Sequence, residues 1–154
     1  METFRLVSEF QPVHRRSFEL ADPTLLRPTA AKPVIMGEWF GLNTSYQMAR
    51  GSGTQSVPTF AYFSEEGRYD NQAINKGSFL LMGPYEAETL FFDGTLISAV
   101  GQRLFVGNVT YGGVADRQGL IGVAGPTTEV SIGIVTRLPA NNNGWLRFIR
   151  TMAA

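Results

Sequence analysis

A pair of carboxylates is the part of this sequence best suited to acid–base chemistry. Glu86 and Glu88 are two positions apart, so on a strand both side chains project from the same face. A glycosidase uses two carboxylates roughly 5 Å or 6.5–9.5 Å apart, and Tyr62, Tyr69 and Tyr85 are candidate aromatic walls for a sugar. Neighbouring surface acids are common, however, and 154 residues leave little room for a substrate cleft. We therefore expect no catalytic residues and keep a carbohydrate-binding β domain as an alternative.

The inventory of metal-binding and nucleophilic residues is short. There is no cysteine and only one histidine, His14, which follows a proline-containing stretch and precedes two arginines. Zinc and other transition metals prefer imidazole and thiolate ligands, and no Asp-rich calcium loop is present. The glycine pairs lack the Lys-Ser/Thr ending of a phosphate-binding loop. The sequence thus predicts neither a metal site nor a cofactor.

The overall charge argues for protein partners. Thirteen basic and thirteen acidic residues give zero net charge, whereas nucleic-acid binding depends on an excess of Lys and Arg. Eleven of the thirteen bases are Arg, which is enriched in protein interfaces. No run approaches 18 apolar residues, and the acids Glu2 and Glu9 do not fit a signal peptide. We expect no nucleic acid, no membrane association, and synthesis in the cytoplasm.

Charges of opposite sign gather in two different parts of the chain. Residues 60–98 hold six acids against two bases, and residues 137–154 hold three arginines and no acid. One interpretation is a surface on which charges happen to cluster. The sharper one is complementary docking between copies. That interpretation predicts inter-subunit contacts made by Glu86, Glu88, Arg147 and Arg150.

The first 33 residues differ in composition from the rest. They hold four of the eight prolines, and their apolar residues are spaced apart. Proline fixes φ and removes a ladder donor, so we expect an extended arm over 1–33 beside a single domain over 34–154. The arm is expected to pack on the domain's own flank or on another chain. Its candidate anchors for a partner are Phe4, Leu6, Phe10, Arg15, Arg16 and Phe18.

Strand signals run along the whole chain. Turn residues recur about every eight to twelve positions, and no segment has a convincing helical period. The expected strands are 4–10, 34–40 with a bend at Gly37, 59–63, 78–82, 87–92, 96–100, 103–106, 120–124, 130–136 and 145–150. This spacing predicts an all-β fold, a small antiparallel β-barrel or sandwich with an extended N-terminal arm.

Several segments give the chain a resemblance to a known family. These are the proline-rich arm and the motifs Gly37-Glu38-Trp39-Phe40, Gly67-Arg68-Tyr69-Asp70, Gly83-Pro84-Tyr85-Glu86-Ala87-Glu88-Thr89, Ile132-Gly133-Ile134-Val135 and Gly144-Trp145-Leu146-Arg147-Phe148-Ile149. Together they resemble the head decoration (capsid cement) proteins of tailed double-stranded DNA bacteriophages. The resemblance spans most of the chain from about residue 33.

The resemblance implies a viral structural protein and not an enzyme. Its members form small β-barrels that trimerise on the outside of the mature head. There they bridge and stabilise subunits of the major capsid protein, which would make this chain a homotrimer on the virion surface. Another virion module, such as a tail or head fibre, is the alternative within the same class. Removal of residues 1–20 is then expected to leave the domain folded and to abolish docking.

Overall fold

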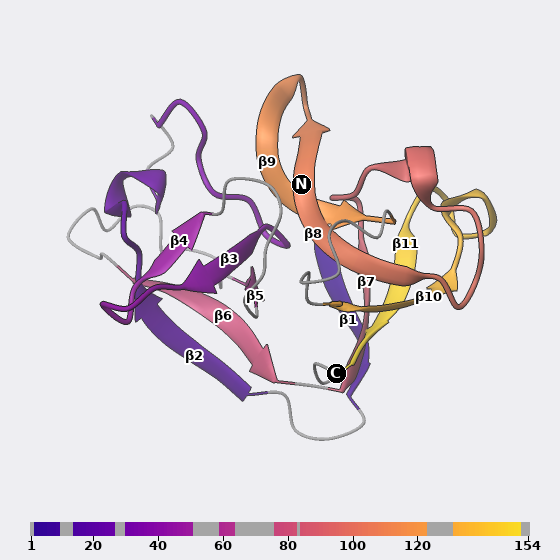
Figure 1. Cartoon of the computed structure of the whole chain (residues 1–154), viewed down its shortest axis with the longest axis horizontal. Helices are drawn as coiled ribbons and strands as arrows, with labels where there is room; N and C mark the ends of the chain where they lie inside the picture. The colour runs from indigo at the N-terminus through magenta and orange to yellow at the C-terminus, as the bar shows by residue number, and fades with distance from the viewer. Residues whose placement is uncertain are drawn as a thin grey trace.

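The computed structural model describes residues 2–9, 14–26, 30–50, 59–63, 76–82, 84–122 and 131–151. Strands and three short 3-10 turns make up the regular structure of these residues, with no α-helix among them. The strands form two curled antiparallel sheets in a half-barrel, sandwich-like arrangement (Figure 1). The all-β prediction is therefore confirmed.

The larger sheet has six strands in the order β1-β7-β11-β10-β8-β9. Their bounds are β1 Phe4–Glu9, β7 Tyr85–Thr89, β11 Leu146–Arg150, β10 Gly133–Arg137, β8 Arg103–Tyr111 and β9 Val114–Ile121. The long β8–β9 hairpin turns at Gly112 and Gly113, whose φ angles are +59° and +79°. Positive φ at both central residues is typical of the tight turn that matches strand twist, and glycine adopts it without steric cost.

The smaller sheet has five strands in the order β2-β6-β5-β3-β4. Their bounds are β2 His14–Glu19, β6 Lys76–Met82, β5 Thr59–Tyr62, β3 Trp39–Leu42 and β4 Met48–Arg50. The 3-10 turn η1 (Pro23–Leu26) follows β2. In this fold the described part of the first 33 residues supplies an edge strand to each sheet, because β1 pairs with β7 and β2 with β6.

The free edges of both sheets are partly covered by single parallel bridges. Leu20, just after β2, pairs with Met48 on β4, and Phe92, beyond β7, pairs with Leu120 on β9. The amides of Ala21 and Asp93 strengthen these bridges by donating to the carbonyls of Met48 and Leu120, each at 2.9 Å. In the smaller sheet the bridge joins the end of edge strand β2 to edge strand β4, and in the larger sheet it joins the segment after β7 to edge strand β9. Both bridges limit the edge available for uncontrolled pairing.

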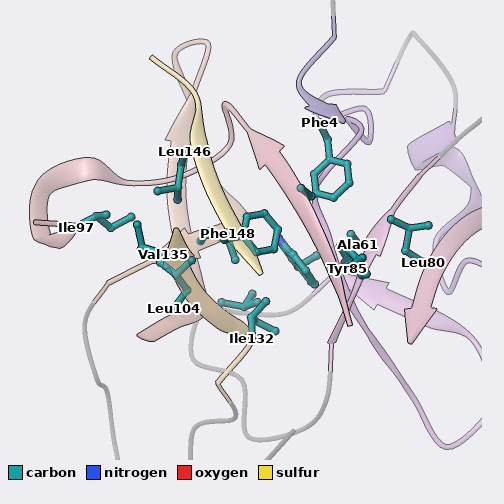
Figure 2. Packing of buried hydrophobic residues seen from close by; sticks show 14 residues of the cluster. Phe4, Ala61, Leu80, Tyr85, Ile97, Leu104, Ile132, Val135, Leu146 and Phe148 are labelled. Atoms are coloured by element: carbon teal, nitrogen blue, oxygen red, sulfur yellow. The ribbon is translucent and has the colours of Figure 1, made fainter. Parts of the chain in front are cut away.

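Inward-facing residues of the larger sheet build the main hydrophobic core together with Trp39, Ala61 and Leu80 of the smaller sheet (Figure 2). Phe148 on β11 lies at its centre, within 6.5 Å ring-to-ring of Phe4, Trp39 and Tyr85. All four side chains are at most 1% exposed. Edge-on and tilted ring contacts of this kind add about 0.5–1.5 kcal/mol each beyond simple burial. The aromatic residues that the sequence placed in strands are thus largely core residues.

A second core lies under the smaller sheet. Its buried members are Leu20, Val34, Phe40, Met48, Tyr62 and Phe79. The rings of Phe40 and Tyr62 each lie 5.5 Å from that of Phe79, edge to face. Leu20 is 2% exposed although it belongs to the proline-containing N-terminal segment. The main core is thus shared by both sheets, whereas the second core is built by the smaller sheet and its flanking segments.

Two strand predictions need correction. Residues 96–100 do not form a strand; the 3-10 turn η2 (Gly94–Leu96) and a following loop occupy this stretch. Residues 34–38 are likewise not part of a strand, since Gly37 has φ +93° in a turn and β3 begins only at Trp39. In both cases hydrogen bonds formed outside any ladder satisfy the backbone.

Candidate interaction surface

The turn between β3 and β4 displays an aromatic side chain. Tyr46 is 77% exposed, and its φ of +59° is unusual for a residue other than glycine. The side-chain Oδ1 of Asn43 accepts hydrogen bonds from the amides of Ser45 and Gln47, both at 2.9 Å. The amide of Tyr46 also donates to the Asn43 carbonyl at 3.1 Å. These bonds hold the turn in one conformation, so Tyr46 is presented on a fixed backbone.

The connection between β7 and β8 displays two aliphatic side chains. Leu96 is 53% exposed and Val100 is 64% exposed. One glutamine fixes this loop: the Oε1 of Gln102 accepts from the amide of Ser98 at 2.9 Å, and its Nε2 donates to the carbonyls of Leu96 and Gly122. The side chain of Gln102 therefore holds the loop that follows η2 in place.

An acid fixes the start of the same loop. Asp93 caps η2 by accepting from the amide of Thr95 at 3.0 Å and from its hydroxyl at 2.7 Å. These bonds lower the pKa of Asp93, so the cap stays ionised well into the acidic range. A cavity of about 160 Å³ opens beside it, lined by Asp93, Leu96, Asn108, Ile121 and Gly122. The exposed Leu96 thus borders a small hollow with a carboxylate at its wall.

The two displayed loops lie at opposite ends of the molecule. In Figure 1 the β3–β4 turn lies at the left end of the long axis, and the coil between β7 and β8 lies toward the right. Among the described residues, Tyr46, Leu96 and Val100 are the three most exposed large hydrophobic residues. One molecule therefore offers a rigid apolar contact at each end. We call these the Tyr46 turn (residues 43–47) and the Leu96 loop (residues 94–102).

Glu88 is the centre of a charged cluster on the outer face of the larger sheet. It is 3% exposed, and its carboxylate lies 2.7 Å from Nε of Arg5 and 3.0 Å from Nη2 of Arg147. Asn142 donates to it as well. Burial by itself raises the pKa of Glu88, but the hydrogen bonds from Asn142, Arg5 and Arg147 outweigh it and lower that pKa. The guanidinium of Arg5 also lies over the Trp145 ring, 4.1 Å from its centre.

Residues expected to make contacts between copies already pair within one chain. Glu88 and Arg147 do attract one another, but they do so within one chain, because β7 and β11 are neighbours with these two residues in register. Glu86 projects from the same face, as expected, and accepts a hydrogen bond from Thr136 at 2.9 Å. Arg150 is 6% exposed and lies on the inner side of the sheet. Little of its side chain is therefore exposed for a contact with another copy.

The predicted anchors of the N-terminal segment fall into two groups. Phe4 is 1% exposed in the main core, and Leu6 and Phe18 are partly buried against the two cores of their own chain. Arg16 is exposed on β2, with its guanidinium 5.0 Å from the Phe18 ring centre. These apolar side chains face inward because β1 and β2 pair within the fold. Phe10 and the side chain of Arg15 lie outside the described part of the chain.

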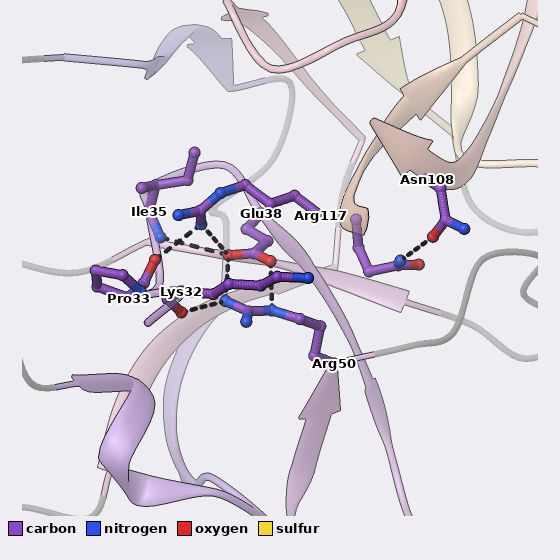
Figure 3. Close-up of polar contacts among 8 residues, drawn as sticks. Lys32, Pro33, Ile35, Glu38, Arg50, Asn108 and Arg117 are labelled. Carbon is purple, nitrogen blue, oxygen red and sulfur yellow. Dashed lines mark hydrogen bonds and ion pairs between the residues drawn. The ribbon is translucent and has the colours of Figure 1, made fainter. Parts of the chain in front are cut away.

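A second buried carboxylate joins the two sheets (Figure 3). Glu38 precedes β3 and is fully buried. Its Oε2 lies 2.6 Å from Nε of Arg50, although these two atoms are not aligned for a hydrogen bond. Its Oε1 accepts a hydrogen bond from Nη2 of Arg50 at 2.9 Å. Arg117, on β9 of the other sheet, approaches it at 3.5 Å and donates to the Pro33 carbonyl at 2.8 Å. Burial raises the pKa of Glu38, and the two guanidiniums only partly offset that rise. Glu38 therefore links the sheets as a structural ion pair.

Two of the three tyrosines expected to form aromatic walls for a sugar are buried. Tyr62 and Tyr85 are each 1% exposed, so neither ring can stack on a ligand. Burial raises the pKa of Tyr85 to about 12. Tyr69 lies outside the described residues. Glu86 and Glu88 share a face, but the carboxylate of Glu88 is occupied by two arginines and an asparagine.

Within the described ranges, no cluster of three or more His, Asp or Glu side chains is arranged to hold a metal ion. The same residues contain no helix of the length and apolar character needed to cross a lipid bilayer. No protein-family model, curated protein or solved structure matches the chain.

Sequence reasoning missed the residues of both displayed loops. Tyr46 lies in a segment too short for any element, and Leu96 and Val100 fit an apparent strand. Polar residues near these positions were the available sequence signal. Asn43 is three positions before Tyr46 and Gln102 is two positions after Val100, and both side chains are able to hydrogen-bond the local backbone.

Proposed function

We propose that this protein is a viral capsid decoration protein that binds the outside of the mature head and bridges neighbouring subunits of the major capsid protein. It acts there as a homotrimer on the virion surface. It has no catalytic role, and its partners are the capsid protein and copies of itself.

One observation carries the proposal: the Tyr46 turn and the Leu96 loop present fixed apolar side chains at opposite ends of the long axis. A protein that bridges two neighbours needs a contact at each end. Backbone that is already ordered by Asn43 and Gln102 loses less conformational entropy on binding. Exposed aromatic and aliphatic residues on such loops are suitable anchors for protein interfaces.

Other features support the same class of function. Low charge and an excess of Arg over Lys favour protein–protein contacts. Two hydrophobic cores and ion pairs at Glu38 and Glu88 make a small fold that is stabilised without disulfides. Such a fold suits a protein that must keep its shape outside the cell.

The test is co-sedimentation with expanded shells of the phage whose genome encodes this chain. Tyr46→Ser alters one end, and the double variant Leu96→Ser/Val100→Ser alters the other. Loss of one anchor is expected to weaken binding about tenfold or more, equivalent to roughly 1.4 kcal/mol. Loss of both ends should abolish it, because the two contacts on one shell reinforce each other.

The control is Ala115→Ser on the exposed part of β9, which changes a surface residue outside both loops. It should bind like the unaltered protein. Circular dichroism and thermal unfolding confirm that each variant is folded. Undiminished binding by the variant that lacks all three apolar anchors would contradict the proposal, as would failure of the unaltered protein to bind expanded shells.

A further inference from the structure

Arg150 is a cation held between the two sheets. It lies at the end of β11, where the register pairs it with Tyr85 on β7, and it is 6% exposed. Its guanidinium faces two rings of the smaller sheet, 5.3 Å from the centre of Trp39 and 5.9 Å from that of Phe60. One nitrogen donates to the carbonyl of Thr59 at 2.9 Å. Both sheets thus contribute to its surroundings.

No acid neutralises this cation among the side chains that the structure describes. The other strongly buried arginine, Arg117, has Glu38 at 3.5 Å, whereas no ion pair is formed by Arg150 within the described residues. Burying a guanidinium is costly unless an opposite charge and hydrogen bonds compensate for the lost water. The aromatic faces compensate in part, since a cation is attracted by the ring quadrupole.

Two residues next to Arg150, Tyr85 on the adjacent strand and Thr59 at its hydrogen-bonded carbonyl, carry hydroxyl groups that lack partners. Oη of Tyr85 and Oγ1 of Thr59 are buried and form no hydrogen bond, and both residues are 1% exposed. A buried polar group without a partner is rare in a folded protein and calls for a cause. Here Tyr85 is the strand partner of Arg150 and interacts with its charge, and the Thr59 carbonyl accepts a hydrogen bond from its guanidinium, which has five N–H donors.

The shared chemistry of these groups is donation to a negative charge. A guanidinium pairs with a carboxylate or phosphate through two parallel hydrogen bonds, and hydroxyl donors complete the coordination of such an oxyanion. We propose that Arg150, Tyr85 and Thr59 form a binding site for a small oxyanion, either a carboxylate or a phosphate, at the junction of the two sheets. Occupation of this site stabilises the joined arrangement of the sheets.

Thermal unfolding with added anions tests the site. The melting temperature is measured in increasing sodium phosphate and, separately, sodium acetate, against sodium chloride at equal ionic strength and neutral pH. We expect a saturable rise with at least one oxyanion, since a ligand that binds only the folded state raises its stability. A rise with phosphate alone identifies a phosphate site, and a rise with acetate identifies a carboxylate site.

Tyr85→Phe is the discriminating variant because it removes one hydroxyl and keeps the ring in the core. In chloride it should be at least as stable as the unaltered protein, since the lost hydroxyl had no partner. Its apparent affinity for the oxyanion should fall at least tenfold. Tyr46→Phe makes the same chemical change at an exposed position and should leave the response intact. An equal response of Tyr85→Phe and unaltered protein, or no saturable response in the unaltered protein, overturns the proposal.

Discussion

Replacement of the Phe4 side chain by alanine tests whether the N-terminal strand is part of the folded domain. The Phe4 ring is 1% exposed and lies 6.1 Å from the ring of Phe63 and 6.3 Å from that of Phe148. Replacing a buried Phe by Ala typically costs about 3–5 kcal/mol. A single domain has a total free energy of unfolding of about 5–15 kcal/mol. Phe4→Ala should therefore remove a large part of the stability.

Urea unfolding followed by tryptophan fluorescence measures this loss, because Trp39 belongs to the same core as Phe4. With a slope of about 2 kcal/mol per molar urea, a loss of 4 kcal/mol shifts the midpoint by about 2 M. The matched control is Val7→Ala on the same strand, at a side chain that is 38% exposed. It should cost less than about 1 kcal/mol.

Similar effects of Phe4→Ala and Val7→Ala would contradict the burial of Phe4 in the main core. They would mean that β1 does not pack on the main core in solution and that the N-terminal segment behaves as a free arm. The burial of Phe4 and of Leu20 also speaks against the expectation that residues 1–20 can be removed without harm to the domain. We expect that deletion to destabilise both sheets.

Three further predictions concern the interior and the assembly. Gly133→Ala should lower the free energy of unfolding, measured by urea titration, by at least about 2 kcal/mol, because the added β-carbon would clash with the Ile149 carbonyl oxygen. In the control Gly94→Ala, the added β-carbon would have no neighbour nearer than 3.4 Å, and the loss should be under about 1 kcal/mol. Arg117→Met should cost about 2–3 kcal/mol at neutral pH. That cost should shrink as the pH falls through the raised pKa of Glu38, since the protonated carboxyl no longer needs a cation; a cost independent of pH would contradict the assignment. Light scattering should give a mass threefold that of the 16.9 kDa chain, at least at high concentration, whereas a strict monomer both free and on shells would exclude a trimeric decoration.

Alternation and turn residues were sufficient to predict much of the fold. The strand expected over 4–10 is β1, and the one expected over 145–150 is β11, because apolar residues of these segments do face the core. The β8–β9 hairpin was only half predicted. Arg117 and Gln118 make its second strand look polar, yet they are 6% and 0% exposed. Their partners are Glu38, which comes from before β3, and Asn108, which lies opposite Gln118 on β8, and a sequence pattern reveals neither pairing.

The charged residues illustrate the same limit. The opposite charges of the two segments predicted that the acids near Glu88 meet the arginines near Arg147 of another copy, and Glu88 and Arg147 form an ion pair within one chain. Whether they meet within one chain or between two depends on the strand order, and β7 lies beside β11 in the same sheet. The loop at 96–100 was misread because its apolar residues favour a strand, whereas Gln102 hydrogen-bonds its backbone and holds it apart from any ladder.

The most direct test of the proposed function is a cryo-EM reconstruction of expanded phage shells saturated with the purified protein. We expect ordered density on the outside of the shell at threefold and quasi-threefold positions. Each copy should contact one capsid subunit through the Tyr46 turn and a neighbouring one through the Leu96 loop. Shells without added density, or density in which neither loop touches a capsid subunit, would contradict it.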